Sequence, residues 1–126
     1  PVFDLSAVKP ENERVIVFYV SGSYLHFRNI EVVGTQVTIV GHTQSECFRN
    51  EGGSDNIYEH LSMHDGMAIG FYIVTGKNNL VLNCDAYNNY DPVSEMDSVD
   101  ISLLPNIRAM YSGGVVRGIT AMMVLI

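Results

Sequence analysis

Two stretches of this chain, 23 residues apart, follow nearly the same pattern. One begins Asn56-Ile57-Tyr58 and the other begins Asn79-Leu80-Val81. In both, apolar and polar residues alternate after the Asn, and the stretch closes in a polar cluster. A repeat of twenty-odd residues built from short strands and turns is typical of a β-solenoid. Neighbouring rungs of a solenoid lie about 4.8 Å apart, so we expect Asn56 and Asn79 to stack as a short amide ladder.

The composition favours an all-β chain that folds as a single domain. The 126 residues are 47% hydrophobic and 17% charged, which is typical of a globular protein. Eleven glycines divide the chain into short runs rich in Val, Ile, Tyr and Phe. We therefore predict a parallel β-helix that is a fragment of a longer rod.

Within that fold, short apolar runs predict the strands between the turns. A bend or bulge is expected between Arg28 and Asn29, where the alternation changes phase. The polar segment 42–55 is predicted to be a surface loop. The expected strands cover residues 15–20, 24–33, 37–40 and 68–74.

Three acidic residues of the segment 42–55 admit two interpretations. Glu46, Glu51 and Asp55 are expected to be solvated charges. The alternative is a paired-carboxylate site of a glycosidase.

The net charge of −7 limits the partners of the chain. It makes nucleic acid an unsuitable partner, because binding phosphates requires clustered Lys and Arg. An acidic polymer would need local cations or a bridging metal ion. The sequence has no apolar stretch of about 18 residues, so we expect no membrane span. Cys84 is predicted to be a small buried hydrophobic residue, and a Cys47–Cys84 disulfide stays open.

Three segments together resemble the pectate lyases of polysaccharide lyase family 9. They are residues 41–52 (GHTQSECFRNEG), 61–72 (LSMHDGMAIGFY) and 83–91 (NCDAYNNYD). The resemblance covers about residues 1–95 and implies a right-handed parallel β-helix. It also implies a secreted, monomeric enzyme, although the chain begins at Pro1 and shows no signal peptide. We expect an interior piece of a longer protein.

The family resemblance implies cleavage of polygalacturonate, or a related acidic polysaccharide, by calcium-dependent β-elimination. Calcium on the uronate carboxylate makes the C5 proton more acidic, and a lysine removes it. In the family, aspartates of a Ser-Asp-Asp-Gly-x-Asp motif hold the calcium. The chain lacks that motif up to residue 95, and its only lysines are Lys9 and Lys77. Lys77 is expected to be a solvated turn residue, so we assign no catalytic or metal-binding residue.

The resemblance leaves the enzyme status of this chain open, and we expect it to be inactive as written. Two alternatives remain, a non-catalytic glycan-binding or adhesin-like β-helix and a β-helix glycoside hydrolase. Chain-length preference and endo or exo action also stay open.

Five polar residues at the ends of the two repeats are candidates for the wall of a substrate groove. The candidates are His64, Asp65, Asn88, Asn89 and Asp91. The alternative is a set of solvated turns with local side-chain hydrogen bonds. Four tyrosines could stack on sugar rings, although we expect them to cover the core with their hydroxyls in water. They are Tyr58, Tyr72, Tyr87 and Tyr90.

Residues 96–126 differ in style from the repeats and end in an aliphatic run. Met has a single codon, so a shifted frame through Met122, Met123 and Val124 must encode Asp-Gly. The neighbouring codons permit a shifted run that ends in Ser-Asp-Asp-Gly-Phe-Asp, which is the calcium motif of the family. Our hypothesis is that the coding DNA slips frame near Glu95, so that this tail is out-of-frame. The alternative is a native tail that caps the solenoid.

Overall fold

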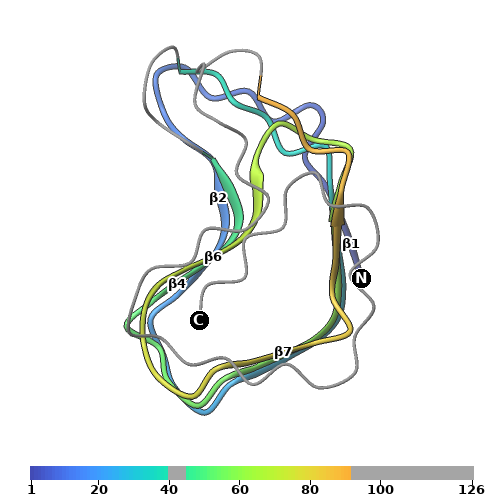
Figure 1. The fold of residues 1–126 in the computed structure, drawn as a ribbon. Helices are drawn as coiled ribbons and strands as arrows, with labels where there is room; N and C mark the ends of the chain where they lie inside the picture. Colours follow the sequence, from blue (N-terminus) through green and yellow to red (C-terminus); the bar gives the residue numbers. More distant parts are fainter. Residues whose placement is uncertain (40–44, 92–126) are drawn as a thin grey trace.

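The computed structural model of the chain describes residues 1–39 and 45–91, which form parallel strands without a helix (Figure 1). The strands are β1 (Val2–Asp4), β2 (Ile16–Val20), β3 (His26–Val33), β4 (Glu46–Glu51), β5 (Ile57–His64), β6 (Ile69–Thr75), β7 (Leu80–Leu82) and β8 (Asp85–Tyr87).

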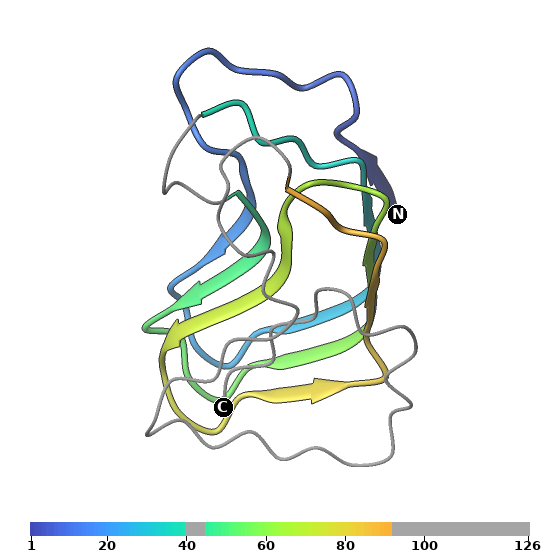
Figure 2. The ribbon, with the colours of Figure 1, turned by 45° about the horizontal axis from the view of Figure 1, so that its top comes forward.

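The strands alternate between two sheets as the chain winds around a common axis. One sheet has the order β1-β3-β5-β7, with β8 also paired to β5, and the other has the order β2-β4-β6. Every strand pair is parallel. Figure 1 shows successive turns superposed, and Figure 2 shows them stacked side by side. The predicted all-β parallel β-helix is therefore confirmed.

The two repeats superpose as the sequence predicts. Ile57 pairs with Leu80, and Tyr58 with Val81. Before them, Asn56 and Asn79 are both buried, and the Asn56 backbone N–H donates to Oδ1 of Asn79 at 3.1 Å. One rung earlier, the Leu25 N–H donates to Oδ1 of Asn56 at 2.9 Å. The two Asn residues therefore occupy equivalent positions, as predicted, but the ladder consists of side-chain oxygens that accept from backbone donors of the preceding rung at a buried turn.

The predicted bend after Arg28 is a corner that recurs in three rungs. Asn29, His60 and Asn83 all have left-handed backbone angles, with φ of 56°, 52° and 51°. Strand pairing passes from Arg28↔Glu59 directly to Ile30↔Leu61. Left-handed φ is most accessible to Asn among non-glycine residues, which explains its use at two of the three corners. At this corner the long strand bends, so that its two halves lie on different sides of the rod.

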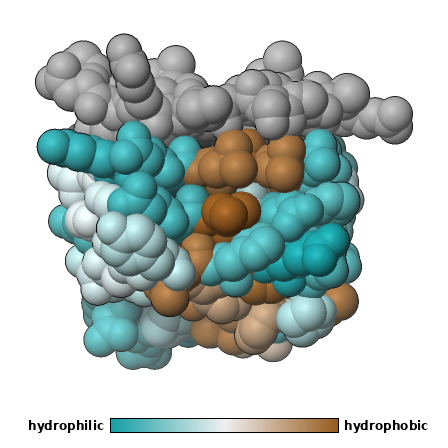
Figure 3. Space-filling view, turned by 90° about the horizontal axis from the view of Figure 1, so that it is seen from below, coloured by the Kyte–Doolittle hydropathy of each residue, from teal (hydrophilic) through white to brown (hydrophobic). Residues whose placement is uncertain are grey.

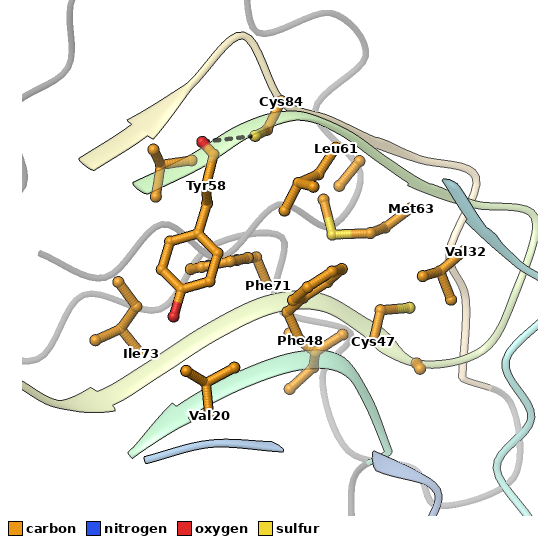
Figure 4. Close-up of a cluster of buried hydrophobic side chains, with 14 residues drawn as sticks. Val20, Val32, Cys47, Phe48, Tyr58, Leu61, Met63, Phe71, Ile73 and Cys84 are labelled. Atoms are coloured by element: carbon orange, nitrogen blue, oxygen red, sulfur yellow. Dashed lines mark hydrogen bonds between the residues drawn. The ribbon is translucent and has the colours of Figure 1, made fainter. Parts of the chain in front are cut away.

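Stacked aromatic rings fill the interior between the two sheets (Figure 4). Phe18 stacks on Phe48 with centroids 4.5 Å apart, and Phe48 stacks on Phe71 at 5.9 Å. Tyr58 is fully buried, and its hydroxyl donates to Oδ1 of Asn50 at 2.7 Å. The expectation of a solvent-facing hydroxyl is therefore wrong for Tyr58, because Asn50 supplies a buried acceptor.

The prediction of a surface loop over 42–55 is wrong for its central part. Glu46–Glu51 forms β4, and four of its six residues are buried. Polar residues fit there because they find partners: Asn50 donates to the carbonyls of Gly53 and Thr75 at 2.9 and 2.8 Å. Gly53 is required beside it, because an added Cβ would collide with the backbone carbonyl oxygen of Gly22 and lie 2.7 Å from Asn50 Oδ1.

The strand expected over residues 37–40 is absent from its described part, 37–39. A side-chain hydrogen bond holds this segment: Thr38 donates its hydroxyl to the Pro10 carbonyl at 2.7 Å. The hypothesis for residues 96–126 lies outside the described residues.

Candidate groove edge

The candidate groove residues follow two strands that end at the same edge of the sheet. β5 ends at His64 and β8 ends at Tyr87, and these two residues pair in register. Each is followed by a left-handed residue, Asp65 with φ of 51° and Asn88 with φ of 52°. The Asp65 N–H donates to the Tyr87 carbonyl at 3.3 Å. The fold therefore brings His64, Asp65 and Asn88 together.

Three side chains contact the ring of His64 at this edge. Its ring lies 4.6 Å from the ring of Tyr87, with 5° between the planes. Nδ1 lies 2.7 Å from Asp65 Oδ2, and Nε2 lies 3.0 Å from Glu31 Oε1. Both carboxylates are therefore within hydrogen-bonding distance of the ring nitrogens. The His64 side chain is only 12% exposed, which limits it to edge contacts with a ligand.

Asp65 connects this rung to the next one. Its Oδ1 accepts a hydrogen bond from Asn88 Nδ2 at 3.2 Å. The hydrogen bond from His64, followed by that from Asn88, lowers the pKa of the Asp65 carboxyl. Asp65 and Asn88 are both exposed. They offer an ionised acceptor and an amide to solvent or to sugar hydroxyls.

Asn89 and Asp91 differ from Asp65 and Asn88, because both are buried. Asn89 Nδ2 donates to the Met63 carbonyl at 3.0 Å, and its Oδ1 accepts from the Gly66 N–H at 3.2 Å. Asn89 therefore fastens the turn from inside the rod. Asn89 is therefore adjacent to Asn88 in the chain, but its side-chain amide is already hydrogen-bonded to the backbone.

The described residues do not fit a calcium site. Calcium requires six to eight oxygen ligands. Within residues 1–39 and 45–91, no group of three or more His, Cys, Asp and Glu residues could hold a metal ion. Lys9 and Lys77 are exposed, and Lys77 lies in the turn between β6 and β7. The described residues therefore contain no carboxylate cluster like the one that the resemblance implies.

A buried carboxylate on β4 was missed by sequence reasoning. Glu46 is 1% exposed, which overturns its expected role as a solvated charge. Its Oε1 lies 2.7 Å from Arg49 Nη1 and 3.7 Å from Arg14 Nη1, while Oε2 has no hydrogen-bond partner. Burial raises the pKa of Glu46, against the effect of both arginines. The spacing of Glu46 and Arg49 in the sequence was the feature that could have indicated this ion pair.

The paired-carboxylate alternative gains no support from this cluster. Arg49 lies between the two glutamates, since its Nε also contacts Glu51 Oε2 at 2.9 Å. The Arg49 guanidinium lies 5.1 Å from the centre of the Tyr72 ring. These contacts describe a structural ion-pair network on the β4 strand.

Both cysteines are buried and free, so the optional disulfide is absent from the structure. Cys84 is buried as predicted, and its thiol donates to the Tyr58 carbonyl at 3.4 Å (Figure 4). Burial raises the pKa of Cys47 to about 12 and that of Cys84 to about 11. Neither thiol is therefore a reactive nucleophile at neutral pH.

The stacked rungs define a class of protein, the parallel β-helix proteins. A family model described as "Pel9A-like, right handed beta helix region" matches residues 1–100, and the chain belongs to this family. No helix among the described residues is long and apolar enough to cross a membrane.

Similar proteins agree with this assignment. Pectate lyase L of Dickeya dadantii (strain 3937) is 36% identical over 95 residues, and that of Dickeya chrysanthemi is 37% identical over 95 residues. Each match covers 72% of this chain and 20% of the relative, so the chain spans about a fifth of the curated relatives. A solved rhamnogalacturonan lyase superposes with a TM-score of 0.75 and 50% identity, over 88% of this chain and 29% of that chain.

Proposed function

We propose that this chain is part of an enzyme that cleaves an acidic pectic polysaccharide by β-elimination. In that enzyme, the described rungs supply scaffold and one wall of the substrate groove. The observation that carries the proposal is the agreement of the family match with two kinds of pectic lyase, one by sequence and one by structure. The enzyme is secreted and monomeric in this proposal, as the resemblance implies.

The polymer is either polygalacturonate or rhamnogalacturonan. The curated relatives are named pectate lyases, and the solved neighbour is named a rhamnogalacturonan lyase. The chain is 50% identical to the solved rhamnogalacturonan lyase and 36% identical to the pectate lyase. This higher identity makes rhamnogalacturonan a candidate substrate beside polygalacturonate. Both polymers carry galacturonate, so both provide the acidic C5 proton that β-elimination needs.

His64, Asp65 and Asn88 are proposed to contact sugar hydroxyls along the groove wall. Asp65 and Asn88 are exposed, and their contacts to each other and to His64 fix their orientation. Such preorganised polar groups orient a substrate without contributing to proton transfer. Asn89 and Asp91 are proposed to support this wall from beneath.

The chain as written is proposed to be inactive. The described residues offer neither a lysine in a groove nor a cluster of carboxylates for calcium. Mixing the 126-residue chain with calcium and either polymer is expected to give no rise in ultraviolet absorbance from unsaturated uronate. A rise in that absorbance would contradict this part of the proposal.

The role of the rungs is tested by grafting. Residues 1–91 replace the matching segment of Pectate lyase L from Dickeya dadantii, and unsaturated product is measured with both polymers. We expect a folded, active chimera, and H64A/D65A in the same chimera should raise KM more than it lowers kcat. A folded chimera that gives no unsaturated product would contradict the lyase scaffold. Product formed equally with a chelator present would indicate a hydrolase, and binding without product would indicate a glycan-binding module.

A further inference from the structure

The outer face of β3, β5 and β7 before the corner carries a second set of polar residues, separated from the groove edge by the corner at His60. Tyr58 and Val81 point into the core. Their neighbours in register point outward and form two columns. The columns are His26–Ile57–Leu80 and Arg28–Glu59–Leu82.

Three basic side chains on this face share one carboxylate. Glu59 Oε2 lies 2.9 Å from His26 Nε2 and 3.4 Å from Arg28 Nε. Its Oε1 lies 3.6 Å from His60 Nε2. Glu59 is 18% exposed, whereas His26, Arg28 and His60 are 46%, 59% and 48% exposed. The basic groups are therefore the accessible part of the cluster.

An apolar band lies beside these basic groups. Figure 3 shows it as brown atoms bordered by hydrophilic ones, on the side of the rod where β7 runs. The partly buried outward side chains Ile57, Leu80 and Leu82 contribute to this face, and Leu25 beside them is 41% exposed. A flat apolar strip next to cations fits a sugar ring that has one apolar face and a carboxylate.

We infer that this face, built on His26, Arg28 and His60, binds the galacturonate carboxylates of an acidic pectic polysaccharide. The inference rests on the proposed function for the identity of the polymer. Charge complementarity carries it, because a chain of net charge −7 needs a local excess of cations to hold a polyanion. Arg28 contacts Glu59 through Nε and stays largely exposed, so it can also meet a ligand carboxylate.

We expect this face to bind the acidic polysaccharide more strongly at acidic pH. Histidine is the side chain that ordinarily changes charge between about pH 5 and 8. With both histidines protonated, three positive charges surround the single carboxylate of Glu59.

The other groups around the histidines are few in the described residues. Asn83 Nδ2 lies 3.5 Å from His60 Nε2, and β7 adds no charged side chain. Asp55 and Lys77 lie in the turns before β5 and β7, and Glu31 and Asp85 face outward beyond the corner. Replacing the two histidines therefore tests directly whether they carry the pH dependence of binding.

Binding of polygalacturonate to the 126-residue chain tests the inference. Titration calorimetry is run at pH 5.5 and 7.5 with a chelator present, so that calcium cannot bridge the partners. Fully methyl-esterified polygalacturonate is the uncharged control ligand. We expect binding of the acidic polymer, stronger at pH 5.5, and little binding of the ester. Circular dichroism of each variant verifies the fold.

Arg28→Gln should weaken binding roughly tenfold, the effect expected for one lost charge-assisted contact. Lys9→Gln removes the same charge from an exposed residue elsewhere and should leave binding unchanged. His26→Gln with His60→Asn should remove the pH dependence; Asn suits position 60, because Asn29 and Asn83 occupy the same corner. The inference is overturned by equal binding of the ester, by unchanged binding of Arg28→Gln, or by no binding at either pH. None of these outcomes affects the grafting test, which reports on the lyase scaffold.

Discussion

The ring of His64 stacks on the ring of Tyr87 one rung away, with 4.6 Å between the centroids and 5° between the planes. Both side chains face outward at the edge where the candidate groove begins. The pair connects the two rungs on the outside of the rod, whereas the stacked phenylalanine rings connect rungs in its interior. The groove edge is therefore fixed by side chains of consecutive rungs.

Tyr87→Ala should destabilise the chain by about 1 kcal/mol beyond the loss of buried area, because it removes the ring that covers His64. Tyr87→Phe keeps the ring and should retain stability within about 0.5 kcal/mol. Urea unfolding followed by circular dichroism measures both. Equal losses for the two substitutions would show that the hydroxyl of Tyr87, and not its ring, matters.

Asn79→Ala should cost about 1 to 3 kcal/mol, because it leaves one buried backbone donor without a partner. This donor is the Asn56 N–H, which now donates to Oδ1, whereas the Gly53 carbonyl loses Nδ2 of Asn79 but keeps the hydrogen bond from Asn50. Lys77→Ala in the adjoining exposed turn is the control and should change stability by less than about 0.5 kcal/mol. Similar urea midpoints for the two variants would contradict a structural role of the ladder.

Glu46→Gln should change how stability depends on pH. Burial raises the pKa of Glu46 in the folded state, so folding favours its protonated form. This group therefore makes the folded chain more stable as pH falls through the folded pKa toward the unfolded value of 4.5, and less stable as pH rises. Glutamine mimics the protonated form and removes that dependence. Urea titrations of both proteins between pH 4.5 and 7.5 should give a stability difference that grows with pH in favour of the variant. A difference that does not vary with pH would contradict it.

The coding sequence across Glu95 should contain a missing or extra base. Restoring the frame should replace residues 96–126 with a further rung that contains Ser-Asp-Asp-Gly-Phe-Asp. Because solenoid rungs stabilise one another, the frame-corrected chain should unfold at a higher urea concentration. A related protein with the same tail in frame would show that the tail is native.

The 23-residue repeat was enough to predict the fold because the solenoid is built from local periodicity. Alternation from Ile57 and from Leu80 fixes which side chains enter the core, and Asn56 and Asn79 mark the shared turn. The bend at Asn29 could be predicted for the same reason, since the alternation changes phase there. Three of the five groove residues could also be placed together, because His64, Asp65 and Asn88 end strands that pair.

The strand β4 could not be predicted, because its polar residues look like loop residues until their partners are known. Burial of Glu46 depends on Arg14, which is remote in sequence, and burial of Asn50 depends on Tyr58 and on backbone carbonyls of the next turn. The cluster of His26, Arg28 and His60 around Glu59 likewise joins two strands whose register appears only in three dimensions. Local alternation thus determined the rod and its repeating turn. Only the stacking of turns decided which polar side chains are buried, which remain accessible, and which share a charge, because those contacts join residues of different rungs.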